Sequence, residues 1–147
     1  MIKLFFKIRV LLNNNNLFLF RPLFYFFYKF ILWLYGASIP LNTRFCDIPT
    51  FPHSLYGIFI SGDAVIGKNA TIFQQVTIGS VVTENSRRIG SPYIKDNVLI
   101  GAGAKVIGNV KIGNNVKIGA NCVVVENIQD DCTVILSKNR ILKKKLK

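Results

Sequence analysis

A six-residue repeat of apolar residues runs through the chain from residue 60 to residue 128 and restricts its fold more than any other feature. The first place of ten hexads holds Ile60, Ile66, Ile72, Ile78, Ile94, Ile100, Val106, Ile112, Ile118 and Val124. The fifth place holds Ala64, Ala70, Val76, Val82, Val98, Ala104, Val110, Val116, Cys122 and Ile128. A helix has a period near 3.6 residues and a single strand a period of 2, so a period of six indicates a short strand followed by a corner.

The fourth place of the hexads indicates where the corners lie. It is Asn, Asp or Gly in eight of the ten: Asp63, Asn69, Asn97, Gly103, Asn109, Asn115, Asn121 and Asn127. These residue types tolerate a positive φ, which tight corners require. Each hexad is therefore one side of a prism, and the chain is expected to form a parallel β-helix whose first and fifth places point inward. Stacking of successive coils supplies the core, but the period leaves the hand of the coil open.

Composition agrees with one folded domain and excludes several classes of site. Half of the 147 residues are hydrophobic, which is enough for a substantial core. The three cysteines are odd in number and form no CxxC pair, and the chain has a single histidine. We therefore expect reduced thiols in a cytoplasmic protein, with neither a disulfide framework nor a metal site.

The net charge of +12 is concentrated at the two ends of the chain. Six of the nineteen basic residues precede Cys46, six lie in the last ten residues, and no acidic residue precedes Asp47. The chain has no nucleic-acid-binding motif, so no nucleic-acid partner is expected. Basic ends beside aromatic residues suit an anionic membrane surface. A solvated basic tail over residues 138–147 is the alternative.

The amino-terminal segment, residues 1–36, is rich in phenylalanine and aliphatic residues. Arg21, Pro22 and Lys29 interrupt its most apolar run, whereas a membrane span needs about 20 mostly uncharged residues. The apolar run is also too long for a secretory signal, and no A-x-A-like cleavage site follows. We expect a helix with Pro22 in its first turn that ends near Gly36. This helix either covers one end of the prism or lies in a membrane interface.

Four motifs, "GASIPLNT", "HSLYGIFIS", "ATIFQQVTIGS" and "GSPYIKDNVLIGAGAKVIGNVKIG", occur in this order. Together they resemble the hexapeptide-repeat acyltransferases, in the serine acetyltransferase-like branch that includes sugar O-acetyltransferases of bacterial surface polysaccharides. The resemblance runs from about residue 36 to residue 142. It implies an all-β, left-handed parallel β-helix over residues 37–137, preceded by a short helical segment. It also implies a homotrimer that binds acetyl-coenzyme A between neighbouring subunits.

The resemblance places the family's catalytic base at His53, the only histidine of the chain. His53 would take a proton from the acceptor hydroxyl, because neutral imidazole titrates near working pH. The alternative is an ordinary loop histidine.

The resemblance also assigns residues to the acetyl-coenzyme A. Backbone N–H groups of tight corners at Gly79, Ser80, Ala102 and Gly103 would stabilise the oxyanion and line the pantetheine arm. Ala120 matches another contact to the arm, and Lys138 and Arg140 match residues that meet the nucleotide phosphates.

The surroundings of His53 offer neutral polar groups to an acceptor. Ser54, Tyr56, Gln74 and Gln75 are the candidate acceptor-binding residues, and the rings of Phe51 and Tyr56 could stack on a sugar.

The chain departs from true serine acetyltransferases at three features. The position of their orienting aspartate corresponds here to Ala37 or Ser38, and Asp47 is the candidate substitute. The positions of their Arg-His loop pair correspond to Gly90 and Ser91, whereas Arg87 and Arg88 lie nearby but out of register. Their large helical domain before the prism is expected to be missing. We therefore expect transfer to a sugar hydroxyl of a surface polysaccharide or its lipid-linked precursor. Serine O-acetyltransferase and a catalytically inactive scaffold are the alternatives. The expected location is the cytoplasm, with peripheral contact to the inner face of the membrane left open.

Overall fold

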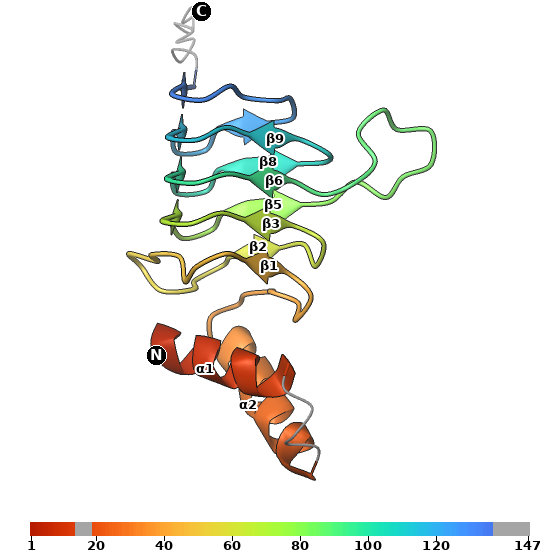
Figure 1. The fold of residues 1–147 in the computed structure, drawn as a ribbon, viewed down its shortest axis with the longest axis vertical. Helices are drawn as coiled ribbons and strands as arrows, with labels where there is room; N and C mark the ends of the chain where they lie inside the picture. The colour runs from red at the N-terminus through yellow and green to blue at the C-terminus, as the bar shows by residue number, and fades with distance from the viewer. Residues whose placement is uncertain (14–18, 137–147) are drawn as a thin grey trace, which may run out of the picture.

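A computed structural model describes residues 1–13 and 19–136. Two helices, α1 (Ile2–Asn13) and α2 (Arg21–Leu34), precede a stack of short strands (Figure 1). The strands are β1 (Arg44–Phe45), β2 (Phe59–Ile60), β3 (Val65–Ile66), β4 (Thr71–Ile72), β5 (Thr77–Gly79), β6 (Tyr93–Ile94), β7 (Leu99–Ile100), β8 (Lys105–Ile107), β9 (Lys111–Ile112), β10 (Lys117–Ile118), β11 (Val123–Val124) and β12 (Thr133–Val134).

The strands form three parallel sheets, each of which is one face of a prism. The sheet orders are β1-β3-β6-β9, β12-β10-β7-β4 and β11-β8-β5-β2, so each strand pairs with strands one coil before or after it. Ile78 of β5, for example, lies opposite Ile60 of β2 and Val106 of β8. The coiled architecture expected from the six-residue period is therefore confirmed.

The core of the prism follows the hexads closely. All ten residues of the first place are buried, and so are eight of the ten residues of the fifth place. Ile128 is only half-buried. The expectation for Val82 is wrong, because its side chain is 82% exposed. Residues 80–92 leave the prism as a projecting loop, so a fifth-place side chain in this loop does not point into the core (Figure 1).

The corners show which fourth-place residues need a left-handed backbone. Asn69, Asn97, Gly103, Asn115 and Asn121 have positive φ, as expected, whereas Asp63, Asn109 and Asn127 do not. Near Asn109 the preceding Gly108 takes the positive φ of 85°. Gln75 also adopts φ 61°, although its residue type gives no hint of it.

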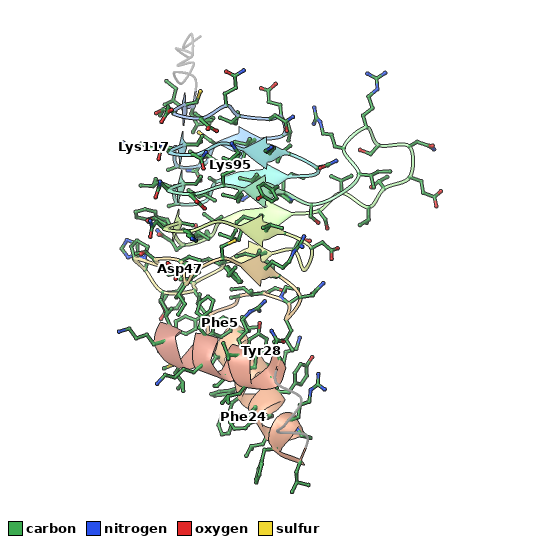
Figure 2. All side chains as sticks on the ribbon, in the orientation of Figure 1. Phe5, Phe24, Tyr28, Asp47, Lys95 and Lys117 are labelled. Carbon is green, nitrogen blue, oxygen red and sulfur yellow. The ribbon has the colours of Figure 1, made fainter. Side chains whose placement is uncertain are left out.

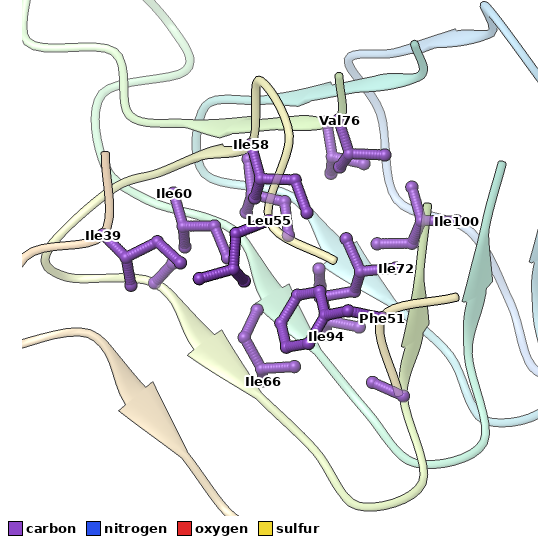
Figure 3. Packing of buried hydrophobic residues seen from close by; sticks show 14 of the residues in the cluster. Ile39, Phe51, Leu55, Ile58, Ile60, Ile66, Ile72, Val76, Ile94 and Ile100 are labelled. Carbon is purple, nitrogen blue, oxygen red and sulfur yellow. The ribbon is translucent and has the colours of Figure 1, made fainter. Parts of the chain in front are cut away.

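Both helices lie beneath the first coil and close that end of the prism. Phe6 of α1 packs against Phe45 and Phe51, with ring centroids 5.3 Å and 6.3 Å apart. Phe51 and Leu55 in turn belong to the same buried cluster as Ile39, Ile60 and the core of the prism (Figure 3). Figure 2 shows Phe5 and Tyr28 at the same junction, where their rings stack 4.9 Å apart. The inner face of the helical segment is therefore an end cap.

A buried arginine joins the cap to the prism. Arg9 is 5% exposed and donates hydrogen bonds to the carbonyl oxygens of Pro40 and Leu41, each at 2.8 Å, and to that of Thr43. It also donates to the Tyr28 hydroxyl at 2.9 Å, and this hydroxyl donates to the carbonyl of Ile39. Arg9 is therefore a structural group rather than part of the basic surface at the amino-terminal end.

Neither helix among the described residues is long and apolar enough to cross a membrane. The helix expected around Pro22 is α2, and the chain turns out of it through Gly36 at φ 55°. The first helix, α1, was not distinguished by the sequence analysis.

Candidate active site

His53 lies in the loop between β1 and β2, in the coil next to the helices. Phe51 and Leu55 on either side of it are buried in the core, so they anchor the loop. The Ser54 N–H donates to the Phe51 carbonyl at 3.1 Å, and Ser54 has a φ of 59°. This tight turn leaves the imidazole exposed to solvent. His53 is therefore held on a short, doubly anchored turn.

The aromatic partner of His53 comes from the next coil. The His53 and Phe73 ring centroids lie 5.9 Å apart, with 49° between the ring planes. Sequence analysis missed Phe73; the only available signal was an aromatic residue at an outward place of a hexad.

No acidic side chain hydrogen-bonds to His53 within residues 1–13 and 19–136. The Asp47 carboxylate instead accepts the N–H of Ile48 at 2.7 Å. Asp47 therefore caps its own turn, and the suggestion that it substitutes for the orienting aspartate gains no support.

Four stacked turns form one edge of the prism, here called the Gln75 edge. It consists of the pairs 56–57, 74–75, 102–103 and 120–121. The N–H of Gln75 donates to the carbonyl of Tyr56 at 2.8 Å, and the N–H of Gly103 to that of Gln74 at 3.0 Å. The N–H of Asn121 donates to the carbonyl of Ala102 at 2.8 Å. Because Phe73 directly precedes Gln74, His53 lies beside this edge.

The expected acceptor-binding and pantetheine-binding residues therefore come together in one column. Tyr56, Gln74, Gln75, Ala102, Gly103 and Ala120 all belong to the Gln75 edge. These residues are far apart in the sequence and become neighbours only through the register of the coils.

Gly79 and Ser80 lie elsewhere, at the other end of β5. Gly79 is the last residue of this strand and pairs with Ile107 of β8, so the expectation that it forms a tight corner is wrong. Its carbonyl accepts the N–H of Gly108 at 2.8 Å. Ser80 is exposed and begins the projecting loop. The residues assigned to acetyl-coenzyme A are thus divided between two edges of one face.

The backbone donors proposed for an oxyanion are not equivalent. The Gly103 N–H is already used by the Gln74 carbonyl, so its assignment as an oxyanion donor is wrong. The N–H groups of Ser80 and Ala102 donate to no other group in the described part of the chain. They are the donors that remain for a ligand.

Side chains of the Gln75 edge differ in exposure. Tyr56 is 57% exposed and its ring meets that of Tyr35 edge-on at 4.8 Å. Gln75 is exposed, and the Oε1 of Gln74 is buried without a hydrogen-bond donor among the described residues. Phe51 is 5% exposed, so the expectation that it stacks on a sugar is wrong: it packs into the end of the core.

The positions where the chain departs from serine acetyltransferases have structural roles of their own. Ser38 donates its N–H to the Ile58 carbonyl at 2.9 Å and so begins the first coil. Ser91 Oγ lies 3.3 Å from Ser61 Oγ of the preceding coil. Arg87 and Arg88 are exposed in the projecting loop.

Two further expectations concern residues or ligands that the structure does not place. Lys138 and Arg140, together with the rest of the tail at 138–147, lie outside the described residues. Within the described ranges, no group of three or more His, Cys, Asp or Glu side chains lies close enough to hold a metal ion.

Known proteins share the six-residue repeat of this chain and its coiled fold. The family described as bacterial transferase hexapeptide (six repeats) matches residues 91–126. A serine acetyltransferase of Synechococcus elongatus is 41% identical over 109 residues, which cover 74% of this chain and 43% of that protein. The serine acetyltransferase of Staphylococcus aureus strain N315 is 49% identical over 51 residues, or 35% of this chain and 23% of that protein.

Solved structures agree. The crystal structure of serine acetyltransferase isoform 3 from Entamoeba histolytica, in complex with cysteine, is 38% identical and superposes with a TM-score of 0.67. The match covers 80% of this chain and 41% of that one. The chain carries bacterial transferase hexapeptide repeats, and its prism is similar to that of solved serine acetyltransferases. The expected fold class, an all-β left-handed parallel β-helix with a short amino-terminal helical segment, is thereby confirmed.

The hexapeptide prism does not account for the whole length of its relatives. The chain spans 23% of the Staphylococcus aureus protein and 43% of the Synechococcus elongatus protein. The match to the latter over 109 residues extends well beyond the repeats at 91–126.

Proposed function

We propose that the protein is an acetyl-coenzyme A-dependent O-acetyltransferase in which His53 is the general base. The observation that carries the proposal is the position of His53, exposed on an anchored turn beside the Gln75 edge. The similarity to serine acetyltransferases supports the same reaction class.

The reaction requires one proton to move twice. His53 takes the proton of the acceptor hydroxyl as the oxygen attacks the thioester carbonyl, because an uncharged hydroxyl is a poor nucleophile. The carbon–oxygen bond forms, the carbon–sulfur bond breaks, and the imidazolium returns the proton to the leaving thiolate. The N–H groups of Ser80 and Ala102 are the candidates to stabilise the intermediate oxyanion.

The Gln75 edge fits the pantetheine arm of acetyl-coenzyme A. Ala102, Gly103 and Ala120 have little or no side chain, so an extended ligand can approach the backbone closely. The buried Gln74 Oε1 needs a donor, because an unpaired buried acceptor costs about 1–3 kcal/mol. Rotation of the Gln74 side chain toward solvent would let this oxygen accept an amide N–H of the arm.

A homotrimer would bring the two groups of ligand-binding residues together. Ala102 and Ser80 lie at opposite ends of the face that contains β5, and a three-residue strand is about 10 Å long. A neighbour that presents its own Ser80 beside the Gln75 edge would complete the site. Light scattering of the full chain tests this assembly, and a fully active monomer would contradict it.

L-Serine is the acceptor that the comparisons favour, since the relatives and structures named above are serine acetyltransferases. The expectation of a sugar acceptor has no support from them. We therefore place L-serine first.

A sugar hydroxyl is the second candidate, and one observation favours it. Tyr56 presents an exposed aromatic ring on the Gln75 edge, beside His53. Aromatic faces pack well against the apolar side of a pyranose ring. The lipid-linked precursor of a surface polysaccharide would be the natural form of this acceptor.

We also infer a cytoplasmic location. Cys46, Cys122 and Cys132 are free thiols, as is usual in a reducing compartment.

The decisive experiment measures acetyl transfer by the purified full-length protein. Acetyl-coenzyme A is mixed with L-serine or with methyl glycosides of glucose, galactose and mannose, and both thiol release and acetylated product are followed. O-Acetylserine as the main product supports the first candidate, and an acetylated glycoside the second. Absence of thiol release with every acceptor would leave the inactive scaffold and refute the proposed activity.

A further inference from the structure

Helix α2 is apolar on two opposite sides, but the prism and α1 cover only one of them. Tyr28, Ile31 and Leu32 are buried at the junction with the rest of the protein. The other side carries six exposed residues: Leu23, Phe26, Phe27, Phe30, Trp33 and Leu34. Their spacing of three and four residues places them along one side of the helix, here called the outer stripe.

The rings of the outer stripe form a continuous aromatic surface. Phe26 lies 5.8 Å from Phe27 and 6.3 Å from Phe30, and Phe30 lies 5.9 Å from Trp33, measured between centroids. Trp33 is 75% exposed. Contiguous exposed apolar surface of this kind indicates an interaction site.

Two positive charges lie on α2: Lys29 flanks the outer stripe, and Arg21 begins the helix, in register with the buried Tyr28. Arg21 and Lys29 of α2 are exposed, and the Lys29 Nζ lies 5.6 Å from the centroid of the Tyr25 ring. No acidic residue occurs before Asp47, so nothing within the helical segment neutralises them. Two copies of such a helix would repel each other, whereas an anionic surface would attract both charges.

The length of α2 decides how it could meet a bilayer. Its 14 residues correspond to about 21 Å of helix, whereas the hydrocarbon core is about 30 Å thick. A helix of this length, rich in Trp, Tyr and Phe and flanked by Arg and Lys, is suited to lie along the interface.

We propose that the outer stripe of α2 docks the protein on an anionic lipid surface. The aromatic rings enter the boundary between headgroups and acyl chains, while Arg21 and Lys29 reach lipid phosphates. The same helix caps the prism with its inner side, so the two roles considered for the segment are compatible. Docking rests on the helix alone and does not depend on the proposed catalytic activity.

The proposal has a geometric consequence. His53 lies two residues after Phe51, whose ring packs against Phe6 of α1. A docked protein would therefore hold its candidate base near the lipid surface.

Trp33 makes docking directly measurable, because it is the only tryptophan of the chain. Full-length protein is titrated with vesicles of phosphatidylglycerol and phosphatidylcholine at low salt, and with vesicles of phosphatidylcholine alone. We expect Trp33 emission to shift to shorter wavelength and the protein to float with the anionic vesicles. Weaker flotation at high salt is expected as well.

Variants separate the stripe from the rest of the surface and keep the Trp33 reporter. Phe26→Ser with Phe30→Ser should weaken partitioning by at least about tenfold, because each buried aromatic ring contributes roughly 1.5–3 kcal/mol. Arg21→Glu with Lys29→Glu should weaken binding to anionic vesicles in particular. The matched control is Val82→Ser with Ile135→Ser, two exposed apolar residues outside the helices, and it should bind as the unmodified protein does.

Two results would overturn the proposal. One is unchanged Trp33 emission together with protein that stays soluble at every vesicle composition. The other is stripe-dependent self-association in sedimentation experiments without lipid, combined with no flotation, because it would make a second copy the occupant. Circular dichroism of each variant confirms that the prism is intact.

Discussion

His53 and Phe73 belong to successive coils, and their rings lie 5.9 Å apart between centroids. The position of the candidate base therefore depends on the register between the loop at 49–57 and the turn that follows β4. Phe51 and Leu55 fix the loop from the core side, and Phe73 lies against the imidazole from the next coil.

The first prediction concerns the base itself. His53→Ala should lower turnover by about two to four orders of magnitude, the usual contribution of a general base. Because the side chain is exposed, the fold and the binding of acetyl-coenzyme A should be retained. Initial rates of thiol release measure the first effect, and calorimetric titration measures the second. Near-normal turnover would exclude His53 as the base.

The second prediction concerns the support of His53. Phe73→Ala removes the neighbouring ring and should lower kcat by about tenfold, because the imidazole loses a fixed orientation. Phe73→Leu keeps an apolar surface there and should lose less. The KM for acetyl-coenzyme A should stay within about twofold in both variants. A change confined to KM would assign Phe73 to ligand binding instead.

The third prediction concerns the link between cap and prism. Arg9→Met leaves the carbonyl groups of Pro40, Leu41 and Thr43 without their donor, so unfolding free energy should fall by about 2–4 kcal/mol. Tyr28→Phe removes one hydroxyl and should cost about 1–2 kcal/mol. Urea titrations compare the two. An Arg9→Met loss no larger than that of Tyr28→Phe would show that the guanidinium is dispensable.

The fourth prediction concerns alkaline pH. Burial raises the pKa of Tyr28 above its ordinary value of 10.0, although the nearby Arg9 partly opposes the shift. Above pH 10 the unfolded chain loses this proton while the folded chain keeps it, so Tyr28 makes stability fall as pH rises toward the folded pKa. Unfolding free energy measured from pH 9 to pH 11 should therefore decline less steeply in Tyr28→Phe. Equal slopes would show that Tyr28 ionises alike in both states.

The fifth prediction tests one corner of the Gln75 edge. Gly103 has φ 69°, and the only atom that a Cβ there would press against is Oδ1 of the exposed Asn121 side chain, which can turn away. Gly103→Ala should therefore cost about 1–2 kcal/mol, mainly from the positive φ. Gly36→Ala is the matched control, because Gly36 has φ 55° and a Cβ there would meet nothing within 4 Å, so its loss should be similar. Thermal unfolding of both variants gives the comparison, and a clearly larger loss for Gly103→Ala would show that Asn121 is held in place.

The repeat by itself determined the coil and most of its core. Ile66 and Val106, for instance, are buried because a period of six returns each first-place side chain to the inside. Resemblance drew attention to His53 as the candidate base and to Ala102, Gly103 and Ala120 of the Gln75 edge. The local sequence pattern was sufficient to predict the buried core because each coil contacts only the coils next to it.

Other features were decided by contacts between segments that no local pattern encodes. The burial of Arg9 depends on Tyr28 and on the carbonyl groups before β1, and Phe51 is buried because α1 covers it. Ala102 and Ser80 lie apart because they are at opposite ends of the prism face that contains β5. A six-residue period describes the inside of a prism, but only the tertiary structure decides which segments close its end and which groups meet at its edges, because those contacts join residues with no fixed spacing along the chain.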